Sequence, residues 1–126
     1  ITPESVTLWG TGTPMREFLW SEEMADASVH VLLNVDFKDT YTEGSKDIRN
    51  CHINVGTGKE VSIREVAEII MKEIGFKGIL LWDSSKPDGT MRKLTDVSKL
   101  HSLGWHHKVE IDEGIERLYE WYLKGV

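Results

Sequence analysis

The pattern of apolar and polar positions predicts short strands interleaved with helices. Val6 to Trp9 is rich in β-forming residues, and Glu17 to Trp20 is a second short candidate strand. After it, apolar or small residues recur at helical spacing at Met24, Ala25, Ser28, Val31 and Leu32. We therefore expect a helix from about Ser21 to Leu33, with Ser21 as its N-cap and two glutamates in its first turn.

The middle of the chain loses this periodicity and then regains it. From Asp36 to Asn50 the residues are polar and of mixed charge, which predicts a solvated, mobile loop. A charged surface for a partner is the alternative interpretation of this segment. Cys51 to Val55 is predicted to be a short strand, and the glycines at 56 and 58 indicate a turn behind it.

A capping box marks the start of the next helix, because Ser62 and Glu65 can each satisfy the other's free backbone N–H group. The expected apolar face of this helix comprises Ile63, Val66, Ala67, Ile70 and Ile74. Gly75 is expected to end the helix, and Gly78 to Trp82 is predicted to be a buried strand.

Two more helices are predicted near the end of the chain. Asp96 is expected to cap a short helix that ends at Leu103 and Gly104, with Trp105 packing behind it. The last helix runs from about Asp112 to Lys124, and its expected buried face is Ile115, Leu118, Tyr119 and Tyr122. Strands alternating with helices indicate a small α/β unit.

Composition fits one ordinary globular domain, with 126 residues, 40% hydrophobic and 29% charged. The net charge of −6 argues against nucleic-acid and membrane-surface binding, and no apolar run has the length of a membrane span. The single cysteine, Cys51, cannot form an internal disulfide, so we expect a buried structural thiol and a cytoplasmic protein. The chain begins at Ile1 without a methionine and enters a strand almost at once, so we expect a piece of a longer protein.

The segment from Leu8 to Phe18 carries the first candidate chemistry. Gly10 and Gly12 are separated by one residue, which lets the backbone approach a ligand closely. Trp9 opens this loop and Arg16 closes it, a pairing that suits a phosphorylated ligand with a ring, since guanidinium grips phosphate and indole gives apolar contact. A hairpin turn with a core tryptophan is the alternative interpretation.

A second loop supplies the basic cluster that an anionic ligand needs in an acidic chain. From Ser84 to Lys93 the loop carries three basic residues against a single acidic one. If both loops lie at the same edge of the sheet, five residues converge on one ligand: Trp9, Arg16, Asp88, Arg92 and Lys93. The alternative for each basic residue is a solvated surface charge.

Other kinds of chemistry are not indicated by the sequence. The five histidines lack the spacing of a metal site, and no nucleophile elbow is present. Gly10 and Gly12 lack the third glycine of a dinucleotide fingerprint, and the loop does not lead directly into a helix. We therefore expect no catalytic, metal-binding or cofactor-binding residue in this chain.

These residues resemble those of the GDP-L-fucose synthase family, which belongs to the extended short-chain dehydrogenase/reductases. The resembling segments occur in the same order, at Val6–Leu19, Ile53–Gly58, Ile63–Glu65, Ser85–Leu94 and Leu103–Trp105. Asn-Val-Gly-x-Gly and Arg-Glu-Phe recur across nucleotide-sugar epimerases and dehydratases, whereas Trp-Gly-Thr-Gly-Thr-Pro-Met-Arg and Lys-Pro-Asp-Gly-Thr are more specific. The chain departs from the pattern at Trp20, where many members have His or Tyr, and at Met91, where Pro is common.

The resemblance implies that residues 1–126 are the C-terminal, substrate-binding domain of such an enzyme. It implies conversion of GDP-4-keto-6-deoxy-D-mannose to GDP-L-fucose with NADPH, which an N-terminal Rossmann domain absent from this chain would bind. The catalytic residues would also lie there, so the chain alone would be inactive, and the full-length enzyme would be a homodimer. By position, Trp9, Arg16 and Asp88 match residues that contact the GDP-sugar, and Lys93 matches a basic residue near its phosphates.

Two alternatives remain open at this point. The chain can be the substrate domain of another nucleotide-sugar epimerase or dehydratase, which shares the less specific motifs. It can also be a free-standing, non-catalytic module that binds a sugar nucleotide.

Overall fold

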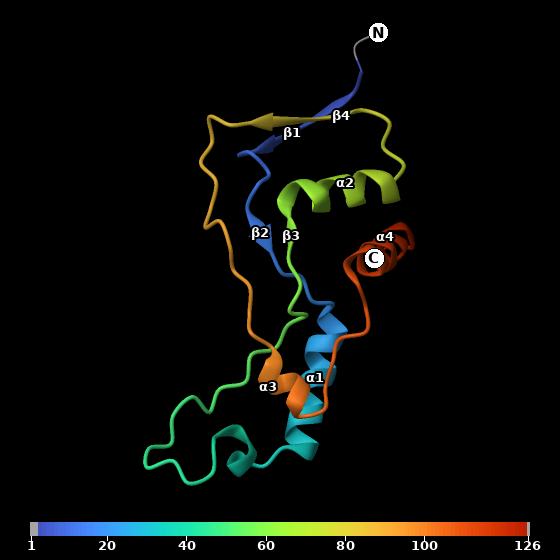
Figure 1. Cartoon of the computed structure of the whole chain (residues 1–126). Coiled ribbons are helices and arrows are strands. Elements are labelled where there is room, and N and C mark those ends of the chain that lie inside the picture. Colours follow the sequence, from blue (N-terminus) through green and yellow to red (C-terminus); the bar gives the residue numbers. More distant parts are fainter. Residues whose placement is uncertain (1–2, 126) are drawn as a thin grey trace.

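A computed structural model describes residues 3–125, and its upper part in Figure 1 is a two-stranded parallel sheet above two helices. Strand β1 (Ser5–Trp9) pairs with β4 (Ile79–Asp83), with Ser5 opposite Ile79 and Trp9 opposite Asp83. Because the strands are parallel, the loops that follow Trp9 and Asp83 leave from the same edge of the sheet.

Helix α2 (Ile63–Glu73) lies below this sheet and packs against α4 (Ile111–Leu123). A second, short sheet consists of β2 (Met15–Arg16) and β3 (Val61–Ser62), which pair in antiparallel orientation. It lies between the parallel sheet and the lower part of the molecule. The expected α/β class is confirmed.

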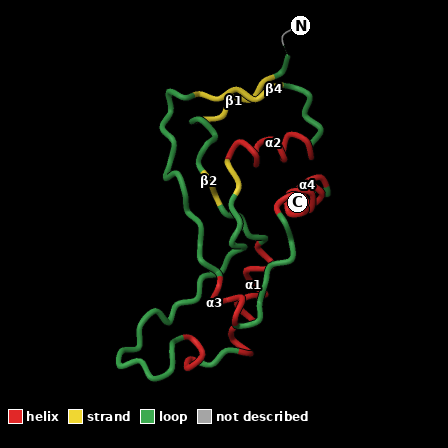
Figure 2. The backbone as a smooth tube through the Cα atoms, in the orientation of Figure 1, coloured by secondary structure: helices red, strands yellow, loops and turns green. Residues whose placement is uncertain are grey.

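The lower part contains α1 (Ser21–Asn34), a 3₁₀ helix (Phe37–Thr40) and α3 (Ser98–Ser102). Its small core is formed by Ala27, Leu100 and Trp105, and the Trp105 indole donates a hydrogen bond to Asp26 at 2.8 Å. Long loops join the two parts, as the green tube in Figure 2 shows. Within residues 3–125, the helices are too short or too polar to cross a membrane.

The helix predictions are largely confirmed because their end signals are local. In the capping box, the Glu65 N–H donates to the Ser62 hydroxyl at 3.1 Å and the Ser62 N–H donates to the Glu65 carboxylate at 2.7 Å. The Asp96 carboxylate accepts the N–H of Ser98 at 2.9 Å, although Val97 is the N-cap of α3.

Two strand predictions are wrong. The short strand after the glycine loop is Met15–Arg16 and not Glu17–Trp20, because pairing with β3 fixes its position. Residues 51–55 form no strand, since Ile53 and Val55 pack against the helical core without a paired neighbour. Cys51 is half-buried and not buried.

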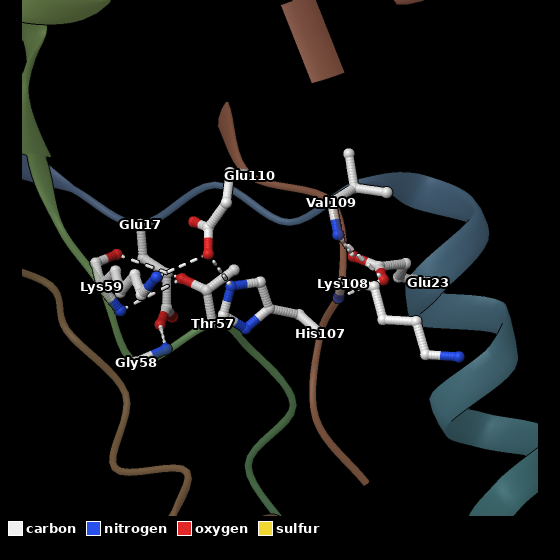
Figure 3. Close-up of polar contacts among 9 residues, drawn as sticks. All are labelled: Glu17, Glu23, Thr57, Gly58, Lys59, His107, Lys108, Val109 and Glu110. Carbon is white, nitrogen blue, oxygen red and sulfur yellow. Dashed lines mark hydrogen bonds and ion pairs between the residues drawn. The ribbon is translucent and has the colours of Figure 1, made fainter. Parts of the chain in front are cut away.

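The apolar periodicity of α1 locates the helix but does not identify its buried side. Glu23 and Ala27 are its buried residues, whereas Leu32 is 81% exposed. The reason is a polar anchor: the Glu23 carboxylate accepts the N–H of Lys108 at 2.5 Å and that of Val109 at 3.1 Å, as Figure 3 shows. The helix is therefore turned toward this loop by a charged residue. Its N-cap is Trp20 and not Ser21, with no side-chain hydrogen bond.

Two elements are less buried than predicted. In β4, Ile79 and Leu81 are exposed, because α2 covers one face of the sheet and alternate side chains point to the other. In α4, Leu118 and Tyr122 are exposed, whereas Ile115 and Tyr119 are half-buried. Apolar surface is thus left open on both layers of the upper part.

Carboxylates also fasten the loops that connect the two parts (Figure 3). Glu17 accepts the N–H of Gly58 at 2.6 Å and, through its other oxygen, the hydroxyl of Thr95 at 2.6 Å. Glu110 accepts Lys59 at 2.5 Å and the His107 ring at 3.1 Å. The contacts of Glu17 and the Glu110–Lys59 contact join segments far apart in the sequence. The hydrogen bond from Gly58 to Glu17 also holds the predicted turn at Gly56 to Gly58 in place.

Candidate functional site

The two loops predicted to converge do lie together at the edge where β1 and β4 end. Between them is a cleft of about 120 Å³, lined by Trp9, Gly12, Pro14, Arg16, Ile63, Pro87, Asp88 and Gly89. Three of the predicted site residues, Trp9, Arg16 and Asp88, therefore share one cleft. The parallel pairing of the two strands is the physical reason for their convergence.

Asp88 joins the second loop to the first. Its carboxylate accepts the backbone N–H of Thr11 at 2.9 Å and the Thr11 hydroxyl at 2.6 Å. Gly10 allows this approach, because a Cβ there would lie 2.3 Å from the Asp88 oxygen, and its φ of +86° favours glycine. Two of the four lone-pair positions of the carboxylate are thus occupied, and the others remain for a ligand.

These hydrogen bonds also change the acidity of Asp88. The Thr11 hydroxyl, followed by the Thr11 N–H, lowers the pKa of Asp88 below its ordinary value of 3.8. Since the pKa is lowered in the folded chain, the link between the loops is fully present above pH 3.8 and is lost as the pH falls through the folded value. Asp88 is consequently an anion at neutral pH, suited to hydroxyl or amine groups and not to phosphate.

Arg16 forms a second link between the loops. Its Nη1 donates to the carbonyls of Met15 and Thr90, each at 2.6 Å, and the Met15 N–H donates to the Met91 carbonyl at 2.7 Å. A guanidinium has five N–H donors, and within residues 3–125 those on Nη2 and Nε have no hydrogen-bond partner. Arg16 is therefore held in place by one nitrogen while three N–H groups remain for an anion.

Trp9 presents its ring to solvent beside the cleft. Its side chain is 75% exposed, so the alternative of a core tryptophan is wrong. The Lys86 ammonium lies 5.4 Å from the ring centroid, within the range of a cation–π contact. An exposed indole beside a basic side chain offers an apolar surface next to positive charge.

The other predicted basic residues are not brought into the cleft. Arg92 forms an ion pair with Glu60 and does not line the cleft. Lys93 is exposed and does not line the cleft. Sequence patterns do not predict Glu60 as the partner of Arg92, because the two residues lie 32 positions apart.

Sequence reasoning also missed Thr11 and Arg64 as parts of this site. Thr11 holds Asp88, and Arg64 donates to the Thr11 carbonyl at 2.7 Å. In the sequence, Thr11 is only the residue between two glycines, and Arg64 lies between the two residues of the capping box without belonging to it. Both contacts join segments far apart in the sequence, and both involve a backbone group of Thr11, its N–H toward Asp88 and its carbonyl toward Arg64, which the side-chain pattern alone does not reveal.

Thr11→Val is expected to raise the pKa of Asp88 toward 3.8, because the lost hydroxyl is the larger cause of the shift. NMR titration of the ¹³C-labelled carboxyl measures this value. Thr13→Val is the matched control, since the Thr13 hydroxyl contacts Thr11 at 2.7 Å but not Asp88. An equal pKa in Thr11→Val and the unsubstituted chain contradicts the assignment.

Comparison with known proteins finds that the chain is similar to nucleotide-sugar enzymes. The model of the NAD dependent epimerase/dehydratase family matches residues 2–56. GDP-L-fucose synthase 1 of Arabidopsis thaliana is 50% identical over 98% of this chain and 34% of its own length. The chain thus spans about a third of the length of the curated relatives that it matches.

Two solved structures have the same fold over nearly the whole chain. A GDP-6-OMe-4-keto-L-xylo-heptose reductase from C. jejuni is 46% identical with a TM-score of 0.89, covering 98% of this chain and 35% of that one. A GDP-mannoheptose C4 reductase from Campylobacter jejuni with NADP bound is 45% identical with a TM-score of 0.84, covering 95% and 35%. The chain is therefore related to the epimerase and reductase enzymes of nucleotide sugars.

Proposed function

From the relation of this chain to the GDP-L-fucose synthases, we propose that it supplies the GDP-sugar-binding part of an NADPH-dependent epimerase-reductase. The reaction is the conversion of GDP-4-keto-6-deoxy-D-mannose to GDP-L-fucose. The observation that carries this proposal is the shared cleft of Trp9, Arg16 and Asp88 at the edge where two parallel strands end.

Each of these side chains has a distinct part in holding the ligand. The three free N–H groups of Arg16 neutralise the diphosphate, and exposed Lys93 approaches it from outside the cleft. The Trp9 ring packs along the nucleotide. The Asp88 carboxylate accepts hydrogen bonds from hydroxyl or amine groups of the ligand. Together they hold the sugar at a fixed place relative to the reacting groups.

The size of the cleft indicates that this chain forms one wall of the complete site. About 120 Å³ is well below the roughly 300–1,000 Å³ of ligand pockets. The outward face of α1 is apolar as well, with Leu32 81% and Leu33 74% exposed, which favours a further layer on that side. We propose that an N-terminal Rossmann domain covers this face of α1 and completes the cleft in a longer, dimeric enzyme.

That domain is also the proposed site of the cofactor, whose chemistry is delivery of a hydride to C4 of the sugar. The loop at Gly10 and Gly12 does not fit the diphosphate of a dinucleotide, because it leads into β2 and not into a helix N-terminus. The present residues therefore bind and orient the sugar nucleotide, and the chain alone is proposed to be inactive.

A second candidate is a GDP-sugar reductase that acts on another sugar. The similarity to the two heptose reductases supports it, since their identity of 45–46% is close to that of the GDP-L-fucose synthases. In this case the nucleotide contacts stay the same and the sugar differs. Turnover of GDP-heptose and GDP-deoxyhexose substrates by the longer enzyme distinguishes the two.

The chain is expected to bind GDP at least about tenfold more tightly than UDP, which corresponds to about 1.4 kcal/mol. The reason is that the cleft presents a carboxylate acceptor, Asp88, beside the exposed Trp9 ring, and a purine has a larger ring face and amine donors. Isothermal titration calorimetry with each nucleotide measures the difference. Equal affinities favour a different nucleotide-sugar enzyme, and NADPH-dependent turnover by this chain alone contradicts the proposed division of labour.

A further inference from the structure

The start of α2 is fastened to the glycine loop that forms one side of the cleft. The N–H groups of Ile63 and Arg64 donate to the carbonyls of Pro14 and Gly12, at 3.0 and 2.9 Å. N–H groups in the first turn of a helix have no partner within the helix, so they are free to hold another segment. The loop is therefore attached to a rigid element along its backbone.

The Arg64 side chain adds a second contact on the same loop. Its Nη2 donates to the carbonyl of Thr11 at 2.7 Å, and its guanidinium lies 4.5 Å from the centroid of the Trp82 ring. Gly12 lies against that ring too, because a Cβ at this position would come within 2.7 Å of it. Trp82 is part of β4, so Arg64 joins the loop to the sheet.

Thr11 is consequently held on both of its polar sides. Its carbonyl accepts from Arg64, while its N–H and hydroxyl donate to Asp88. Arg64 is exposed and does not line the cleft, and no carboxylate pairs with it within residues 3–125. Its position cannot be explained by an ion pair within that part of the chain.

We propose that Arg64 is a positioning residue of the cleft, which orients Thr11 so that its N–H and hydroxyl face Asp88. A guanidinium suits this task because it can donate from its edge while its face lies on an aromatic ring. Lysine can donate to the Thr11 carbonyl but lacks the planar face for Trp82. The effect on ligand affinity rests on the proposed function, whereas the effect on Asp88 does not.

The test compares Arg64→Met, Arg64→Lys and the control Arg117→Met, an arginine on α4 that pairs with Glu113 four residues earlier. Arg64→Met is expected to weaken binding of GDP about tenfold, since a charged hydrogen bond to the loop is lost. It is also expected to move the pKa of Asp88 upward toward 3.8. Arg64→Lys should recover part of both effects, and Arg117→Met should change neither.

Calorimetry with GDP and NMR titration of the Asp88 carboxyl give the two readouts, and thermal unfolding identifies a variant that fails to fold. Unchanged Asp88 titration in folded Arg64→Met or in folded Arg64→Lys overturns the proposal. If the unsubstituted chain does not bind GDP, the proposed function of the isolated chain fails, and the Asp88 titration still decides the role of Arg64. A shift in Asp88 with unchanged GDP affinity overturns the part that concerns the ligand.

Discussion

Arg16→Ala is expected to raise the KM for the GDP-sugar about 100-fold in the proposed longer enzyme, with the KM for NADPH changed less than about twofold. The substitution removes the free N–H donors on Nη2 and Nε of a side chain that lines the cleft. Hydrogen bonds to a charged group contribute about 1.5–3 kcal/mol each, and about 2.7 kcal/mol corresponds to 100-fold. Steady-state kinetics with each substrate varied in turn measure the two KM values.

The second function of Arg16 has to be separated from the first. Arg16 also joins the loops through the Thr90 carbonyl, so the alanine variant can disturb the cleft itself. Arg16→Lys keeps a positive charge without the planar fork, and we expect its KM to be intermediate. Arg117→Ala serves as the control for loss of an exposed arginine. A similar rise in both KM values would show that Arg16 does not act on the GDP-sugar in particular.

The convergence of the two loops follows from the sequence once the strands are taken as parallel neighbours. Val6 to Trp9 and Gly78 to Trp82 are both recognisable as strands from the sequence. The candidate residues lie at the ends of these strands and in the loops that follow them. The sequence does not show which charged side chains are already paired with other groups of the chain. Arg92 is held by Glu60 and Asp88 by Thr11, and both pairings depend on contacts between distant segments. Three of the five expected residues therefore meet, and two do not.

The orientation of α1 likewise depends on a contact between distant segments that the sequence does not predict. Helical periodicity locates the helix correctly, but apolar residues occur on two opposite faces of it, so periodicity does not decide which face is buried. Glu23 determines which face is buried, because its carboxylate accepts the backbone N–H groups of Lys108 and Val109. These residues lie 85 and 86 positions further along the chain. A rule that places charged residues outside cannot predict this. The outward apolar face is then open for the proposed Rossmann domain.

Leu100→Ala is expected to lower the free energy of unfolding by about 2–5 kcal/mol. Leu100 is fully buried and forms the core of the lower part with Ala27 and Trp105. Because that core is small, few neighbouring side chains can move into the cavity. The expected loss of unfolding free energy is large compared with a typical total stability of about 5–15 kcal/mol. Urea unfolding followed by circular dichroism measures the change. Leu123→Ala, at a side chain 63% exposed on α4, is the control and should cost about 0.5 kcal/mol or less.

The same variant tests whether the core and the cleft are separate. The core of α1 and α3 lies at the lower end of the molecule, and the cleft lies at the edge of the upper sheet (Figure 1). The links that hold the cleft, from Thr11, Arg16 and Arg64, contain no residue of the lower core. Folded Leu100→Ala is therefore expected to bind GDP with unchanged affinity at temperatures below its unfolding transition. A loss of affinity in the folded variant would show that the loops depend on the lower core and would contradict this separation.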